Sequence, residues 1–233
     1  MITSRRRLLS CLVVFSVVGL GCGEPEQEDP IPPQQRCAEE GYKTYLSGAI
    51  EGDDDISLDA ANRQDTTGDI LRQEIRIHLG TARPPGADSA QTIILRLFDP
   101  HSESRTFATY LDNWTSEGPL ELDVFDASDI GAGSSDLTSL EDFGCAIEDD
   151  ATICAQIGFD ATQNELLGDE DELVYNASGG TVTIEGFNSS DRTFAAHWDL
   201  ELGRNVLRYG DESSGQAQGC LRANYNSDDW SLE

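Results

Sequence analysis

Apolar and polar side chains alternate with a period of two along most of the chain after Tyr42. The clearest run is 193–202, where large apolar residues occupy every second position and polar or small ones stand between them. A strand with one buried face and one wet face requires such alternation. The run therefore predicts a strand whose core-facing residues are Phe194, Ala196, Trp198, Leu200 and Leu202.

The β-branched segment 180–187 precedes this run, and the polar residues 188–191 between the two are typical of a turn, so together they predict a hairpin. Further strands are predicted at 43–50, 72–79, 91–98, 105–111, 119–125, 152–159, 172–176 and 221–225. One short helix is predicted over 135–143, because Asp136 is a suitable cap and Leu137 and Leu140 share a helical face.

About ten short strands with little helical periodicity indicate an all-β fold with at most one short helix. We expect an antiparallel β-sandwich of the jelly-roll kind, or a barrel. The composition does not change after Cys37 and no internal repeat is visible, so we expect one domain over 37–225, followed by a polar tail at 226–233.

The first 21 residues have the composition of a signal peptide. Arg5, Arg6 and Arg7 precede the apolar segment 8–20, and small residues follow it. Thirteen residues in a helix reach about 20 Å, which is less than the roughly 30 Å of a bilayer's hydrocarbon core, so a permanent span is disfavoured.

Gly21 and Cys22, at the end of the apolar segment, resemble the lipobox of bacterial lipoproteins. The resemblance implies that the Cys22 thiol receives a diacylglycerol and that Cys22 becomes the mature N-terminus. The alternative is an ordinary secretory signal cleaved after Gly23. Residues 4–10 also resemble a twin-arginine export motif, with a Sec signal that carries three arginines as the alternative.

Residues 22–36 are predicted to be an acidic, proline-rich linker between this anchor and the domain. The segment 23–35 contains four prolines and four acidic residues and has little apolar surface to bury. We therefore expect a lipoprotein of the outer membrane or cell surface of a Gram-negative-type bacterium. A soluble periplasmic or secreted protein is the alternative.

Four cysteines follow Cys22, and an even number in an exported chain predicts two disulfides. Of the three possible connectivities, we expect Cys37 to pair with Cys220, near the two ends of the domain. Cys145 and Cys154 would then staple a short polar loop. A zinc site would require C-x-x-C or nearby histidine spacing, which the sequence lacks.

The chain has 44 acidic and 15 basic residues, for a formal net charge of -29. Such a charge excludes a nucleic-acid partner, because phosphate affinity depends on Lys and Arg, and it argues against basic side chains holding the protein to anionic lipid. Lys43 is the single lysine. Abundant carboxylates with so little lysine resemble proteins adapted to high salt; a genome that favours arginine is the alternative.

Candidate chemistry is sparse, and no nucleophile-elbow, zinc-protease or phosphate-loop motif is present. His197, Asp199 and Glu201 share the polar face of the 193–202 strand, about 6.6 Å apart in sequence order. They could form a metal site or the paired carboxylates of a glycosidase. The alternative is a solvated sheet face.

Two kinds of binding site are also conceivable. The acidic loops 52–55, 148–150 and 168–172 could hold calcium, although none has the EF-hand spacing. Tyr110, Trp114 and Trp230 are aromatic candidates for glycan contact.

Without a recognisable catalytic motif, we expect a non-enzymatic surface or envelope module that acts in adhesion, structure or ligand display. Its partners would be the membrane, through the lipid anchor, and an extracellular glycan or protein. The alternatives are a carboxylate-dependent glycan hydrolase and a calcium- or carbohydrate-binding module. The sequence implies no cofactor beyond possible calcium.

Overall fold

A computed structural model describes residues 35–64, 67–70, 74–98, 111, 115, 118–127, 152–160, 172–188, 190–208 and 210–225. They all belong to one compact unit. The predicted signal peptide, the polar tail, the helix at 135–143 and most of the linker lie outside the described residues. Of the predicted 105–111 strand only Leu111 is described, and it is helical, so the strand prediction is wrong at that residue.

The described residues form ten strands and one short helix, which confirms the all-β prediction. The elements are α1 (Arg36–Glu39), β1 (Thr44–Glu51), β2 (Ile56–Asn62), β3 (Thr67–Ile70), β4 (Glu74–Ala82), β5 (Gln91–Phe98), β6 (Leu120–Val124), β7 (Thr152–Asp160), β8 (Leu173–Asn188), β9 (Thr193–Asn205) and β10 (Ser214–Tyr225). None of these elements is a helix with the length and apolar character needed to cross a bilayer.

The strands form a single mixed sheet. Strands β2, β1, β10, β9 and β8 are antiparallel neighbours in that order, and β8 then pairs with both β6 and β7. The sheet continues through β5 and β4 to β3, again antiparallel. Two short pairings are parallel, β6 with β7 and β3 with β10.

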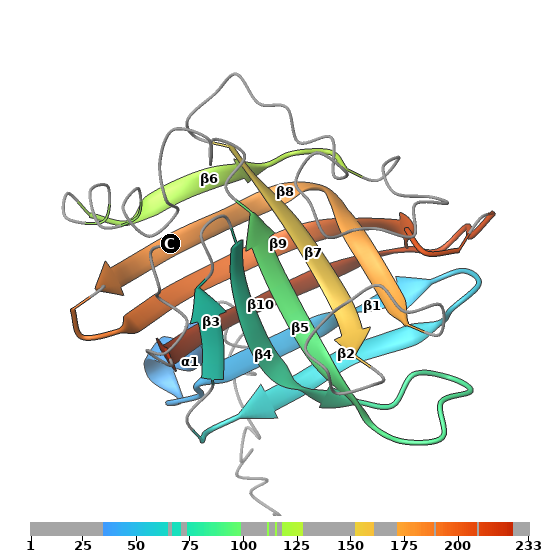
Figure 1. Ribbon diagram of the computed structural model, residues 1–233, viewed down its shortest axis with the longest axis horizontal. Helices are drawn as coiled ribbons and strands as arrows, with labels where there is room; N and C mark the ends of the chain where they lie inside the picture. Colours follow the sequence, from blue (N-terminus) through green and yellow to red (C-terminus); the bar gives the residue numbers. More distant parts are fainter. Residues whose placement is uncertain are drawn as a thin grey trace, which may run out of the picture. The chain divides into compact units, whose positions relative to one another are not determined.

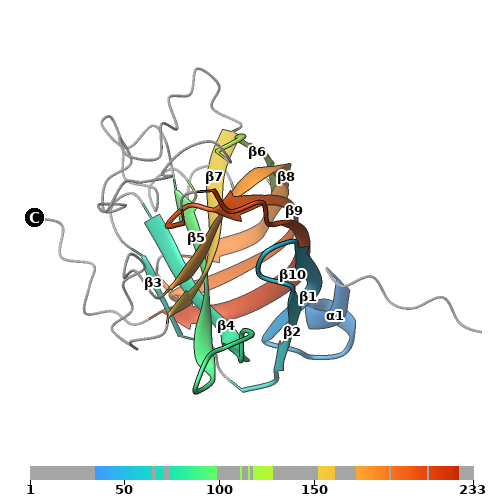
Figure 2. The ribbon, with the colours of Figure 1, turned by 90° about the vertical axis from the view of Figure 1, so that its right-hand side faces the viewer.

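The sheet folds over on itself, so that it makes two layers. In Figure 1, β3, β4, β5 and β7 cross in front of β8, β9, β10, β1 and β2 at a large angle. The view at right angles to it separates β3, β4 and β5 from β10, β1 and β2 (Figure 2). This arrangement corresponds to orthogonal packing of β-layers, with a core of interdigitated side chains between them.

The alternation predicted for 193–202 builds that core. Phe194, Ala196, Trp198, Leu200 and Leu202 are all at most 2% exposed, whereas Asp199 and Glu201 between them are exposed. Strands β5 and β7 differ, because most of their residues are buried on both faces. Their nearly continuous apolar sequences, Thr92–Leu95 and Ile153–Ile157, suit a position covered on both sides.

Strand β8 is one continuous element, although the sequence predicted two strands at 172–176 and 180–187. Its first part pairs with β7 and its second part with β6, so it passes from one layer to the other. Gly180 lies at this corner with φ +111, and a Cβ there would come 2.1 Å from the Asp199 carbonyl oxygen. Only glycine fits this position, so the apparent break in the sequence is a bend within a strand.

The predicted hairpin between β8 and β9 is present, with Asn188 opposite Thr193. The Asn188 side chain accepts hydrogen bonds from the backbone of Ser190 and Asp191, which is the chemistry expected of the turn. Strands β2 and β3 and helix α1 were not predicted, and β10 begins seven residues earlier than the predicted 221–225 strand.

The disulfide between Cys37 and Cys220 is present, with a sulfur–sulfur distance of 2.12 Å. It joins α1 to the middle of the last strand and confirms this predicted pair. Cys154 is buried on β7, but Cys145 lies outside the described residues, so the second pair stays a prediction.

Candidate functional site

The outward face of β1, β10, β9 and β8 carries polar side chains in aligned rows. Ala49 of β1 lies opposite Gln216 of β10, which lies opposite Glu201 of β9 and then Gly179 of β8. The next row crosses the same strands at Ser47, Gln218, Asp199 and Thr181. Antiparallel register thus places residues that are far apart in the sequence side by side.

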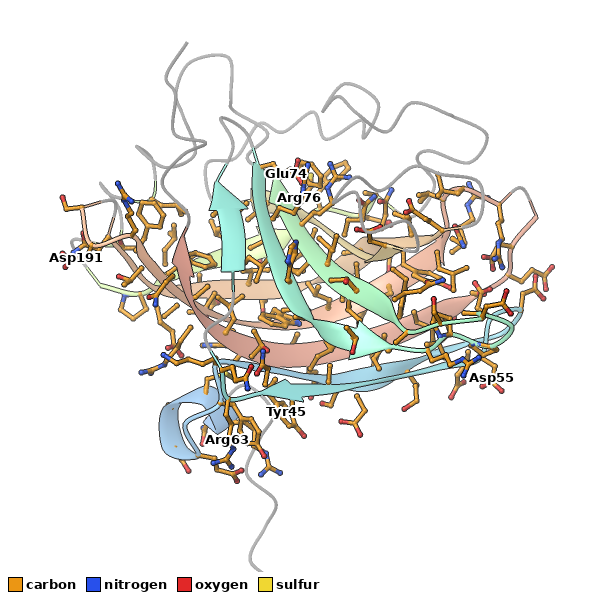
Figure 3. All side chains as sticks on the ribbon, turned by 60° about the horizontal axis from the view of Figure 1, so that its bottom comes forward. Tyr45, Asp55, Arg63, Glu74, Arg76 and Asp191 are labelled. Atoms are coloured by element: carbon orange, nitrogen blue, oxygen red, sulfur yellow. A yellow bond between two sulfur atoms is a disulfide. The ribbon has the colours of Figure 1, made fainter. Side chains whose placement is uncertain are left out.

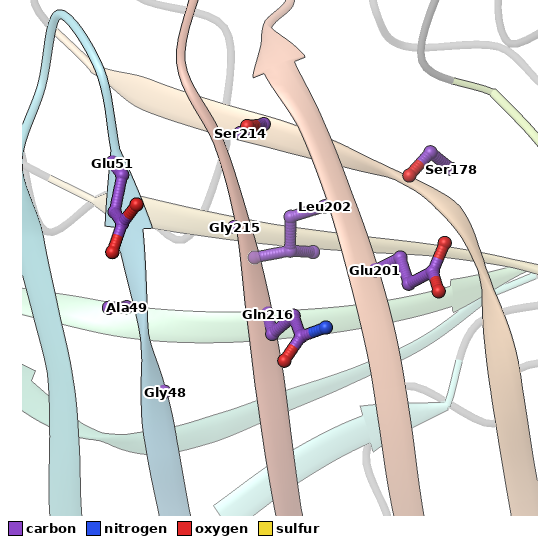
Figure 4. A pocket seen from close by; sticks show the side chains of 9 residues that line it. All are labelled: Gly48, Ala49, Glu51, Ser178, Glu201, Leu202, Ser214, Gly215 and Gln216. Atoms are coloured by element: carbon purple, nitrogen blue, oxygen red, sulfur yellow. The ribbon is translucent and has the colours of Figure 1, made fainter.

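A groove of about 680 Å³ opens on this face (Figure 4). Its lining residues are Gly48, Ala49, Glu51, Ser178, Glu201, Leu202, Ser214, Gly215 and Gln216. In Figure 4, Glu201 and Gln216 stand on neighbouring strands and Glu51 stands across from them on β1. The groove therefore combines carboxylate, amide and hydroxyl groups with a floor of glycine and leucine.

Glycine is required for this groove at the meeting of β1 and β10. Gly48 has φ +146, and a Cβ there would come 1.9 Å from the carbonyl oxygen of Gln216. The absence of a side chain lets the two backbones approach closely and leaves the space above them open.

A second, smaller hollow of about 250 Å³ adjoins the groove on β8, β9 and β10. Both hollows share Glu201 and Gln216, and the second adds Asp199 and Gln218. The Gln218 amide donates a 2.9 Å hydrogen bond to an Asp199 carboxylate oxygen. The two hollows form one elongated polar site on the sheet, which we call the groove site.

Two of the three predicted site residues, Asp199 and Glu201, lie in the groove site, whereas His197 has other partners. Its Nδ1 is 3.1 Å from an oxygen of Glu185, and Arg222 approaches the other oxygen of that carboxylate at 3.8 Å. On this strand face Asp199 and Glu201 are exposed and His197 is half-buried.

The acidic turn 52–55, one of the candidate calcium loops, turns a carboxylate inward. Asp54 is 8% exposed and accepts hydrogen bonds from the Tyr175 hydroxyl and, at 3.1 Å, from Ser213. The Arg208 guanidinium donates a third, at 2.7 Å. Asp54 thus joins the β1–β2 turn to β8 and to the β9–β10 turn, and its oxygens are already occupied by protein donors.

The hydroxyl of Tyr175, the one polar group of this side chain, donates its hydrogen bond to Asp54 in this cluster. Burial, together with the hydrogen bond to Asp54 and the charge of that carboxylate, holds the pKa of Tyr175 above its ordinary value. The phenol therefore stays protonated and acts as a donor.

A second buried polar network crosses the other layer. Arg96 on β5 donates two hydrogen bonds to the Glu74 carboxylate on β4 and one, of 2.9 Å, to the Gln156 side chain on β7. Gln156 continues the network to Asn176 on β8 with a 2.9 Å hydrogen bond. Figure 3 shows Glu74 beside Arg76, whose guanidinium also binds the carboxylate.

Opposing effects act on Glu74. Its burial raises its pKa, but the hydrogen bonds and positive charges of Arg96 and Arg76 outweigh this effect, so the pKa of Glu74 lies below its usual value. The carboxylate is thus ionised and paired, and the network holds four strands together.

Other predicted sites fall elsewhere. Among the residues with described positions, no three His, Cys, Asp or Glu side chains are arranged to hold a metal ion. Loop 148–150, most of 168–172, the lipidation site Cys22, and the aromatic candidates Tyr110, Trp114 and Trp230 lie outside the described residues.

The groove also contains residues that the sequence did not single out, Gln216 and Ala49 among them. Their only signal is the presence of Gly48 in β1 and of Gly215 and Gly219 in β10, which indicates close backbone approach but not a partner strand. Comparison of the chain with family models, curated proteins and solved structures gives no match.

Proposed function

We propose that this protein is an exported, lipid-anchored module of the bacterial surface or envelope, and that it binds an extracellular ligand in the groove site without transforming it. The observation that carries the proposal is the elongated groove across β1, β10, β9 and β8. A hollow in which a few polar groups converge is a candidate ligand-binding site.

The chemistry of the lining favours a polyhydroxylated ligand such as a glycan chain. Carboxylates such as Glu201 accept hydrogen bonds, the amide of Gln216 both donates and accepts, and hydroxyls such as that of Ser214 do either. Sugar hydroxyls need this mixture of donors and acceptors. The elongated outline along β9 and β10 suits a linear chain better than a compact metabolite.

The anchor is supported by the sequence of the N-terminus. Cys22 ends the apolar segment, and the acidic, proline-rich stretch that follows is suited to holding a domain away from a bilayer. Mass spectrometry of the mature N-terminus tests it directly. A diacylglycerol on Cys22 is the expected result, and an unmodified N-terminus at Glu24 would contradict it.

The binding site is tested with a glycan array and the mature chain, followed by titration calorimetry on the glycans that bind. Ala49→Tyr places a ring in the groove, and we expect it to weaken binding at least about tenfold, or roughly 1.4 kcal/mol. The matched control is Ser57→Tyr, because Ser57 is exposed and lies directly opposite Ala49 on β2, outside the lining. Unchanged affinity in Ala49→Tyr would exclude the groove site, and an array without binding would exclude glycans.

A glycan hydrolase is the second candidate, because Asp199 and Glu201 line the same hollow. Alternate positions of a strand repeat at about 6.6 Å along the backbone, so two carboxylates on one strand face can flank a glycosidic bond. Release of reducing ends from a bound glycan, abolished in Asp199→Asn, would establish hydrolysis. Binding without release of reducing ends would support the non-enzymatic ligand-binding module instead.

A further inference from the structure

Two arginines and two tyrosines stack on one another beside α1, at the start of β1. The Arg63 guanidinium lies 4.3 Å from the centroid of the Tyr42 ring, and that of Arg36 lies 5.4 Å from the Tyr45 ring. The two rings are 5.6 Å apart. We call these four residues the Arg–Tyr stack; Figure 3 shows Tyr45 and Arg63 next to α1.

Positive charge gathers at this stack although the chain is strongly acidic. Lys43, the single lysine, directly follows Tyr42, so three of the twelve basic residues after Arg7 lie here. One of them, Arg36, is bound to Glu40. Farther along the same sheet face the exposed charges are acidic, at Asp59, Asp123, Asp199 and Glu201. Exposed carboxylates are not confined to that end, because Glu39 lies on α1 and Glu121 lies in the same cross-strand row as Tyr45.

The Arg–Tyr stack also lies where the chain enters the domain. The described chain begins at Gln35, directly before α1, and the Cys37–Cys220 disulfide fixes this helix to β10. Twelve residues, 23–34, lie between Cys22 and Gln35. In the extended conformation of proline-rich linkers this stretch reaches about 40 Å, at roughly 3.1 Å per residue. A lipid on Cys22 would hold the start of α1 within that distance of the bilayer.

We propose that the Arg–Tyr stack and Lys43 form the face that meets the anionic headgroups of the membrane holding the anchor, and that this contact turns the groove site away from the bilayer. Guanidinium groups pair with lipid phosphates, and tyrosines favour the headgroup region. The inference rests on lipidation of Cys22 in the proposed function.

The net charge of -29 is consistent with this role. The lipid, and not the charge, holds the protein at the surface. The cations of the Arg–Tyr stack and Lys43 then favour their own end at the headgroups, and the carboxylates of the groove site are repelled. Tyr45 stands at the start of β1 and the groove residues Gly48 to Glu51 at its end, so this orientation leaves the ligand site exposed.

Lys43 provides a natural probe of the contact. The mature chain is coupled through the Cys22 thiol to maleimide lipid in vesicles of phosphatidylcholine, with or without phosphatidylglycerol. An impermeant acylating reagent then modifies Lys43, and peptide mass spectrometry gives the rate. We expect acylation to be at least about threefold slower on the anionic vesicles, with the difference lost at molar salt, where the screening length falls to roughly 3 Å.

The double variant Arg36→Gln/Arg63→Gln should abolish this difference between the two vesicles. Arg83→Gln is the matched control, because Arg83 is an exposed arginine that binds backbone carbonyls in the β4–β5 turn, and it should retain the difference. If the double variant does not fold, Arg63→Gln alone is used, since Arg63 is exposed.

Equal Lys43 rates on both vesicles, or a difference that survives in the arginine variants, would overturn the inference. Coupling through maleimide supplies the anchor whether or not cells lipidate Cys22. Failure of the inference is therefore separate from failure of the anchor, which the mass of the native N-terminus decides.

Discussion

Asp54 and Glu74 are buried carboxylates, and each is stable inside the protein for the same reason. Asp54 receives donors from Tyr175, Ser213 and Arg208, and Glu74 receives them from Arg96 and Arg76. An ionised group in the interior is tolerated only when paired in this way, and removal of its partner is costly. The pairings of Asp54 and of Glu74 with Arg96 could not be predicted from the sequence, because these partners lie on other strands or turns; Arg76 is two residues from Glu74 on the same strand.

Glu74 should make the free energy of unfolding depend on pH in the acidic range. Because its folded-state pKa is lowered, its contribution is present above the unfolded value of about 4.5 and is lost as pH falls through the folded value. Glu74→Gln leaves Arg96 without its counter-charge and should cost about 3–5 kcal/mol at neutral pH. Its stability should fall less below pH 5 than that of the parent.

Urea unfolding between pH 3 and 7 measures this difference. Glu121→Gln on β6 is the control, since Glu121 is an exposed carboxylate on a strand of the other layer. If the free energy of unfolding varies with pH in the same way in the parent and in Glu74→Gln, the pairing of Glu74 with Arg96 is not the source of the pH dependence.

At the scale of the elements, β8 and its glycines determine how the sheet turns from one layer to the other. Gly180→Ala would force a side chain against the Asp199 carbonyl in a backbone conformation with φ +111. We expect a loss of about 3 kcal/mol in the free energy of unfolding. The register that builds the groove site should be disturbed as well.

Gly186→Ala is the matched control on the same strand, because a Cβ there meets no atom within 4 Å. It should change stability by no more than about 1 kcal/mol. Denaturant titration measures the free energy of unfolding of both variants. Equal losses in Gly180→Ala and Gly186→Ala would refute the proposed role of Gly180 in the bend of β8.

Strands with one wet face were predictable from sequence, as residues 193–202 demonstrate, because burial imposes a period of two. Strand β2 was missed because it has only Ile56, Leu58 and Ala60 on its inward face, after an acidic turn that reads as loop. The groove site was half predicted: Asp199 and Glu201 lie two residues apart, but the neighbours Ala49 and Gln216 depend on register between distant strands.

At the scale of the whole molecule, the excess of carboxylates places like charges near one another on the surface. Three aspartates, Asp59, Asp199 and Asp123, lie in one cross-strand row on the exposed face. Like charges so arranged repel one another, and dissolved salt screens them over about 10 Å at 0.1 M and 3 Å at 1 M.

We therefore expect the melting temperature to rise by several degrees between low and molar NaCl, as about 1 kcal/mol of relieved repulsion would produce. The triple variant Asp59→Asn/Asp123→Asn/Asp199→Asn should melt higher at low salt and respond less to NaCl. Scanning calorimetry over a NaCl series measures both. A flat response of the parent would exclude the interpretation as a salt-adapted protein.

The bond between Cys37 and Cys220 closes a covalent ring across 183 positions of the chain, and all ten strands begin within it. A protease that cuts one loop between these cysteines opens the ring without dividing the protein into two pieces. Both halves remain attached to whatever holds the N-terminus. With the proposed lipid on Cys22, release of such a singly cut protein from the membrane would require a reductant, or a second cut in the short stretch ahead of Cys37.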